Sequence, residues 1–155
     1  MHYATTFDHL RAATLTLGIS FSGLACAQLG TTFVTPSSPS SMMQHQVSAG
    51  SSVSWFESTD ANQIRIRQYV APTGQVYAVS WDGPAMPDVR ALFGDWFGRY
   101  QQGATEAQAR AGGLHSSSVE GTDLVVESNV RLREFTGRAW LPAALPAGVT
   151  SADIE

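Results

Sequence analysis

Histidines and carboxylates are the side chains of this sequence that could do acid–base or metal chemistry, and they are scattered. After the first 27 residues the histidines are His45 and His115, and neither has a partner at the spacing of a metal-ligand pair. A small hydrolase or transferase would have to combine His115 with Asp82 or Asp88, yet turn and helix-capping roles explain both aspartates. The sequence predicts no metal and no cofactor. It leaves enzyme activity open but favours a non-catalytic protein.

Four arginines form a second candidate site, for binding. Arg65 and Arg67 project from one face of a predicted strand, and Arg131 and Arg133 do the same on a late strand. If those strands are neighbours, four guanidinium groups make an anion-binding patch. Glutamates on the candidate neighbouring strands favour the alternative of a solvated, ion-paired sheet face. These glutamates are Glu57, Glu127 and Glu134.

The first 27 residues resemble a cleaved secretory signal. Arg11 precedes an uncharged stretch, residues 12–24, that is too short to span a membrane, and small residues at Ala25 and Ala27 fit a signal-peptidase site before Gln28. The sequence therefore predicts an exported protein, periplasmic or secreted, with the periplasm preferred.

Cys26 is the only cysteine, and its fate depends on where the signal is cut. Cleavage after Ala27 leaves no thiol, so no disulfide forms in the mature chain. The alternative is a lipoprotein in which Cys26 carries the lipid anchor. With or without that lipid, no transmembrane span is predicted in the mature chain.

Composition excludes one class of partner and limits the number of domains. The formal net charge is −4, which argues against nucleic-acid binding because phosphate contacts require a positive surface excess. The length of 155 residues suits a single core. Residues 28–52 are rich in serine and proline and predict an arm or linker. Residues 53–141 predict a single domain, and prolines from Pro142 onward predict an extended tail over 142–155.

Periodicity within the domain predicts the elements that position these side chains. Three alternating runs at 53–58, 64–71 and 75–81 predict a meander, and three later runs predict further strands. Between them, apolar residues recur at helical spacing from Val89 to Tyr100. The predicted fold is α+β: an antiparallel sheet of about five or six strands with one main amphipathic helix packed on one face, in the order β-β-β-α-β-β-β. The later runs are 114–120, 123–128 and 130–140.

Glycines within the predicted helix require a separate explanation, since each costs about 1 kcal/mol relative to alanine. Gly94 and Gly98, with Ala91, form a strip of small residues beside the aromatic stripe. Close packing of the helix on the sheet explains the strip, and a docking groove for a partner is the alternative.

The central stretch of the domain resembles a known family. Residues 69–84 (YVAPTGQVYAVSWDGP) followed by 87–94 (PDVRALFG) are similar to the exported proteins of domain-of-unknown-function family 2844. The resemblance implies a proteobacterial protein with a signal peptide and no assigned activity. It also implies a gene that lies beside that of another exported protein.

These observations favour a binding or accessory module of the cell envelope, whose partner is another exported protein or an envelope component. The candidate contact surfaces are the loop from Trp81 through Asp82 to Asp88, the glycine strip and the arginine face. The small hydrolase or transferase is one alternative, and a structural surface protein or lipoprotein is the other. The oligomeric state is not predicted.

Overall fold

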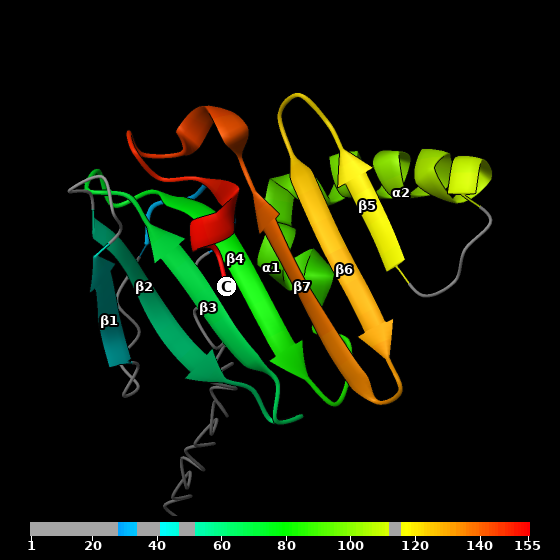
Figure 1. The fold of residues 1–155 in the computed structure, drawn as a ribbon, viewed down its shortest axis with the longest axis horizontal. Coiled ribbons are helices and arrows are strands. Elements are labelled where there is room, and N and C mark those ends of the chain that lie inside the picture. The colour runs from blue at the N-terminus through cyan, green and yellow to red at the C-terminus, as the bar shows by residue number, and fades with distance from the viewer. Residues whose placement is uncertain (1–27, 34–40, 47–51, 112–115) are drawn as a thin grey trace, which may run out of the picture.

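The computed structural model describes residues 28–33, 41–46, 52–111 and 116–155, and these residues build one antiparallel sheet (Figure 1). The strand order is β1-β2-β3-β4-β7-β6-β5. The strands are β1 (Ser41–Gln46), β2 (Ser52–Thr59), β3 (Arg65–Val70), β4 (Val76–Gly83), β5 (Ser116–Glu120), β6 (Val125–Arg131) and β7 (Glu134–Trp140). Two meanders therefore meet where β4 pairs with β7.

This architecture confirms the predicted α+β fold, with the helix between two sets of strands. It adds an edge strand, because β1 lies within the stretch predicted as an arm. Residues 28–33 of that stretch also belong to the fold: Leu29 is 1% exposed, and its amide donates to the carbonyl of Leu92 at 2.9 Å.

The helical region between β4 and β5 is interrupted once. Asp88 caps α1 (Val89–Phe93) by accepting from the amide of Ala91 at 3.0 Å, a 3₁₀ turn η1 (Gly94–Trp96) follows, and α2 (Phe97–Ala111) completes the region. The break falls at Gly94, where φ is +53° and ψ is −120°. A side chain there would also collide with Gln28. Gly94 therefore serves the backbone path of the fold.

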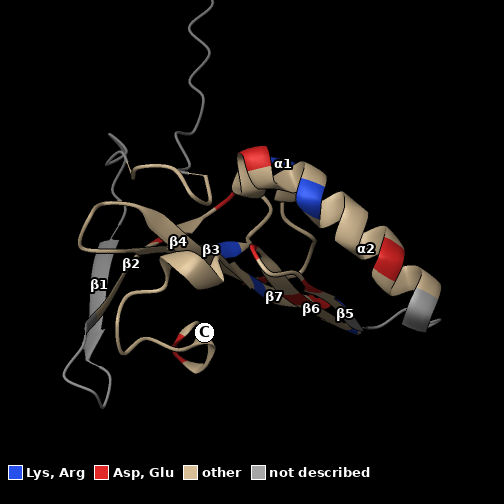
Figure 2. Ribbon diagram, turned by 90° about the horizontal axis from the view of Figure 1, so that it is seen from above, with Lys and Arg blue, Asp and Glu red and all other residues tan. Residues whose placement is uncertain are grey.

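One face of the sheet packs under these helices, as Figure 2 shows. The core on this side is formed by aliphatic and aromatic residues of the sheet, the helices and the N-terminal segment. Its principal members are Leu29, Ile64, Ile66, Val79, Trp81, Leu92, Phe93, Val126 and Ala139. Trp81 lies against Gly137 of β7, where an added Cβ would be 2.3 Å from the indole ring. No described helix is long and apolar enough to cross a membrane.

The end of the chain lies on part of the other face of the sheet (Figures 1 and 2). We call residues 142–155 the strap. Its prolines end β7 as predicted, but the strap is not simply extended: it contains two 3₁₀ turns, η2 (Pro142–Ala144) and η3 (Ser151–Asp153). Val149 and Ile154 are buried against the sheet, Ile154 completely. Burial of these two aliphatic side chains gives the strap a fixed path across the sheet.

Candidate functional site

A row of polar side chains crosses the sheet beneath the strap. Antiparallel pairing places Glu57, Arg67, Ser80, Arg138 and Glu127 directly beside one another, one from each of the strands β2, β3, β4, β7 and β6. We call these five residues the polar row. Its two arginines flank the central serine and its two glutamates close the ends, so the row carries no net charge.

Each arginine of the polar row is fixed by its neighbouring glutamate. Arg67 Nε donates to Glu57 Oε2 at 2.8 Å, and Arg138 Nε donates to Glu127 Oε2 at the same distance. The hydrogen bond that Arg67 donates to Glu57 raises the pKa of Arg67 above its ordinary value, against a smaller opposing effect of burial. A tryptophan ring lies under each guanidinium. Cζ of Arg67 is 5.6 Å from the ring centroid of Trp55, and Cζ of Arg138 is 5.4 Å from that of Trp140. Such contacts hold the arginines in place and leave NH1 of each available to donate to the strap.

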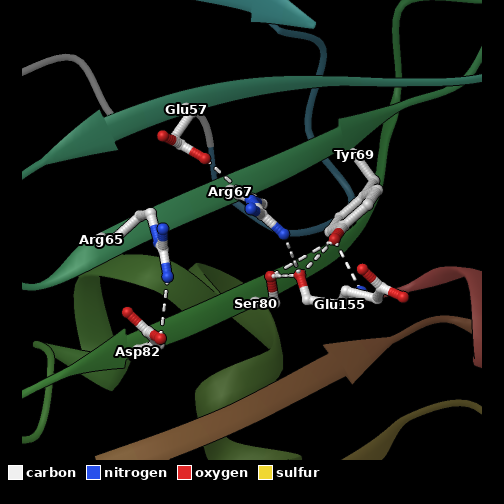
Figure 3. Close-up of polar contacts among 7 residues, drawn as sticks. All are labelled: Glu57, Arg65, Arg67, Tyr69, Ser80, Asp82 and Glu155. Carbon is white, nitrogen blue, oxygen red and sulfur yellow. Dashed lines mark hydrogen bonds and ion pairs between the residues drawn. The ribbon is translucent and has the colours of Figure 1, made fainter. Parts of the chain in front are cut away.

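The terminal nitrogens and the serine bind the backbone of the strap (Figure 3). The backbone oxygen of Glu155 accepts from Arg67 NH1 at 3.1 Å, from Ser80 Oγ at 2.5 Å and from the hydroxyl of Tyr69 at 2.5 Å. The amide of Glu155 donates to the same Tyr69 hydroxyl at 2.8 Å. Both polar groups of one peptide residue are thus satisfied by side chains of β3 and β4.

Arg138 performs the same role for the preceding part of the strap. Its NH1 donates to the carbonyl of Ser151 at 2.7 Å and to the carbonyl of Ile154 at 3.0 Å. Every one of these contacts is to a main-chain atom, so the polar row fixes the backbone path of the strap.

An apolar row lies beside the polar row on the same face of the sheet. Register places its members opposite one another across β2, β3, β4, β7 and β6: Trp55, Tyr69, Ala78, Trp140 and Val125. Ile154 and Val149 of the strap pack in this region. The two rows together hold a peptide by its main chain on one line and by aliphatic side chains on the other.

Tyr77 extends the apolar region toward the first residues of β4. Its ring is buried with Tyr69, at 6.2 Å between ring centroids. Its hydroxyl has no hydrogen-bond partner among the described residues, and burial raises the pKa of Tyr77 to about 12. The Tyr77 hydroxyl therefore remains protonated at physiological pH.

The four predicted arginines do not come together as one patch, because β4 and β7 separate β3 from β6. Arg65 is half exposed and forms an ion pair with Asp82 at 2.9 Å, and Arg67 belongs to the polar row. Arg131 is opposite Glu134 at the end of β6, and Arg133 is exposed in the following turn. Strand order thus separates the two arginine pairs.

The sequence reasoning missed Tyr69, Ser80 and Arg138 as binding residues. Arg138 lies within a predicted strand, two residues before Trp140, so the two share a face. The placement of Arg138 and Trp140 on one face was the feature of the sequence that could have identified Arg138 as a binding residue. Nothing local in the sequence identifies the acceptors, which belong to the strap.

The other predicted contact residues are distributed over both faces. Trp81 and Asp82 lie within β4 and not in a loop, with Trp81 buried on the helix side. Asp82 points to the opposite face, toward Arg65 (Figure 3). Gly98 is exposed on α2 with open space beside it. His115 is outside the described residues, and within them no group of three metal-ligating side chains occurs.

Comparison with known proteins gives one match. The model of a family described as "Protein of unknown function (DUF2844)" matches residues 25–154. No curated protein matches the chain, and no solved structure does.

Proposed function

The chain belongs to the DUF2844 family of proteins of unknown function, and we propose that it is an exported, non-catalytic accessory module of the cell envelope. Its working surface is the sheet face formed by the polar and apolar rows, where it binds a segment of another exported protein. The observation that carries this proposal is the set of side chains from β3, β4 and β7 that hold three backbone oxygens.

Export is supported by the N-terminal sequence and by where the family resemblance begins. The match starts at residue 25, next to the predicted cleavage site before Gln28. Leu29, two residues after Ala27, is already buried in the helix-side core. A chain cut before Gln28 would therefore keep every described residue of this core.

Binding, and not catalysis, is supported by what the side chains of the site contact. The hydroxyl of Ser80 is within hydrogen-bond reach of the Tyr69 hydroxyl, at 3.4 Å, and of the backbone oxygen of Glu155. Neither group is a base that would activate a serine nucleophile. The two glutamates of the polar row are occupied by arginines. The site is built from hydrogen-bond donors, as expected for recognition of peptide oxygens.

Site-specific photo-crosslinking in cells tests this proposal. A photoreactive amino acid replaces Arg65, which lies on the working face two residues before Arg67, or Arg99, which lies on α2 and pairs with Asp123 at 2.7 Å. Both arginines are exposed and ion-paired, so the two variants are matched. We expect at least fivefold more cross-linking to an exported protein from position 65. Equal yields, or cross-links confined to position 99, would refute the working face.

A further inference from the structure

The strap shows what kind of peptide the two rows accept. Within it, η3 is closed by two hydrogen bonds from one residue: the amide and the hydroxyl of Thr150 both donate to Asp153 Oδ2, at 2.7 and 2.8 Å. This capping box fixes a single turn between Val149 and Ile154. The turn presents both aliphatic side chains to the sheet and leaves the carbonyls of Ser151 and Ile154 directed at Arg138.

The strap is held in a way that permits its release. Its amides at Val149 and Ile154 bond within the strap, to the carbonyls of Pro146 and Ser151, and form no ladder with a strand. Among the described residues, the hydrogen bonds between the strap and the sheet are formed by side chains of the sheet. Releasing it would break no strand pairing, whereas the preceding Leu141 amide is bonded to the carbonyl of Tyr77 in β4.

We propose that the two rows bind, in place of the strap, a segment of another exported protein with the pattern aliphatic, Thr or Ser, two residues of any type, Asp, aliphatic. The strap is the resident competitor for this site. The inference rests on the proposed function and specifies its ligand. A tethered competitor acts at an effective concentration of the order of millimolar, so an incoming segment must bind with higher intrinsic affinity or be tethered itself.

A peptide-binding measurement tests the pattern. The probe is a dye-labelled peptide with the sequence of residues 146–155, and the control peptide carries the change Ile154→Asp. The protein is the full exported chain, either wild type or with Ile154→Asp to weaken the strap. We expect the probe to bind the Ile154→Asp protein at least about tenfold more tightly than wild type, and the control peptide to bind neither.

An arginine variant tests whether the polar row holds the probe. Probe affinity is compared with and without this arginine in the Ile154→Asp protein. In wild type, loss of the arginine would weaken binding of the strap and of the probe alike. Adding Arg138→Ala to Ile154→Asp should reduce probe affinity at least tenfold. Binding that survives this change, or equal binding of probe and control peptide, would overturn the proposal. So would a wild-type dimer that exchanges straps, since the occupant would then be a second copy.

Hydrogen exchange on the wild-type chain keeps the proposal testable if Ile154→Asp prevents folding. The bonded amides of Val149 and Ile154 should exchange at least tenfold faster than the Leu141 amide, because the strap opens without unfolding the sheet. Equal rates would show a permanently fixed strap and overturn the proposal. Cross-linking at position 65 without peptide binding would refute only this inference. Peptide binding without any cross-linked partner would refute the proposed function.

Discussion

Two glycines of α2 offer a matched test of how the helix packs. Gly98 lies on the solvent side, and a Cβ built there meets nothing within 4 Å. Gly103 faces β5, and a Cβ there would be 2.2 Å from Cγ1 of the buried Val119. The same substitution, Gly→Ala, therefore adds a methyl group to open space in one case and to a filled contact in the other.

The expected effects on the free energy of unfolding have opposite signs. Alanine is favoured over glycine in a helix interior by about 0.8–1 kcal/mol. Gly98 is near the helix start, so Gly98→Ala should raise the free energy of unfolding by a similar or slightly smaller amount, about 0.5–1 kcal/mol. Gly103→Ala has the same propensity gain, but forcing a methyl into a close-packed contact costs about 1–3 kcal/mol. Its net effect should be a loss of up to about 2 kcal/mol.

Urea unfolding followed by circular dichroism measures both changes. We expect a higher urea midpoint for Gly98→Ala and a lower one for Gly103→Ala. In thermal unfolding, Gly98→Ala should raise the melting temperature by about 2–4 °C. Adding Val119→Ala should make Gly103→Ala less harmful than it is alone, since the smaller side chain leaves room for the methyl group. A stabilising Gly103→Ala, or a destabilising Gly98→Ala, would refute the described packing of α2 on β5.

Three further predictions concern other parts of the chain. Tyr77 has a pKa of about 12 in the fold and about 10 when unfolded, so the unfolded state loses the proton first and stability should fall from pH 10 to 12. Tyr77→Phe should abolish this component in unfolding measurements at each pH, and a pH dependence equal to that of wild type would contradict the assignment. Gly94→Ala should cost about 1–3 kcal/mol by thermal unfolding, because φ is +53° and Gln28 fills the space, and an unchanged midpoint would disprove this role. Under the proposed export, the intact mass of the mature chain should correspond to a protein that begins at Gln28, whereas a lipid-modified Cys26 would establish the anchored alternative.

Local patterns were sufficient for the central strands and for the position of the helical region, although not for its break at Gly94. At the start of β3 and just before it, the alternation of Ile64 and Ile66 with Arg65 and Arg67 assigns one set to the core and the other to the opposite face, and the structure agrees. Asp88 was expected to complement the positive end of a helix, and it caps α1. These features depend on neighbours within one turn or one strand, which a sequence displays directly.

The edge strand and the strap lacked such a pattern. β1 has the sequence SMMQHQ, with no β-branched or aromatic residue, and pairs with β2 alone at the edge of the sheet. In the strap, Val149 and Ile154 are isolated apolar residues among small and polar ones. Two such residues establish no periodicity, and their burial depends on the aromatic surface that β3, β4 and β7 assemble.

Strand order determined how the arginines would be used. The expectation of a shared patch assumed that the strands of Arg67 and Arg131 are neighbours, but β4 and β7 intervene. The same order places Arg67 and Arg138 on either side of Ser80, although they are far apart in the sequence. Both arginines therefore act on one peptide, and each is neutralised by a glutamate from the next strand outward. A neutral row of this kind would not attract free anions over a distance. Its fixed donors instead suit backbone oxygens, and those of the strap occupy them. This occupancy favours the proposed peptide-binding face over the anion-binding patch expected from the four arginines.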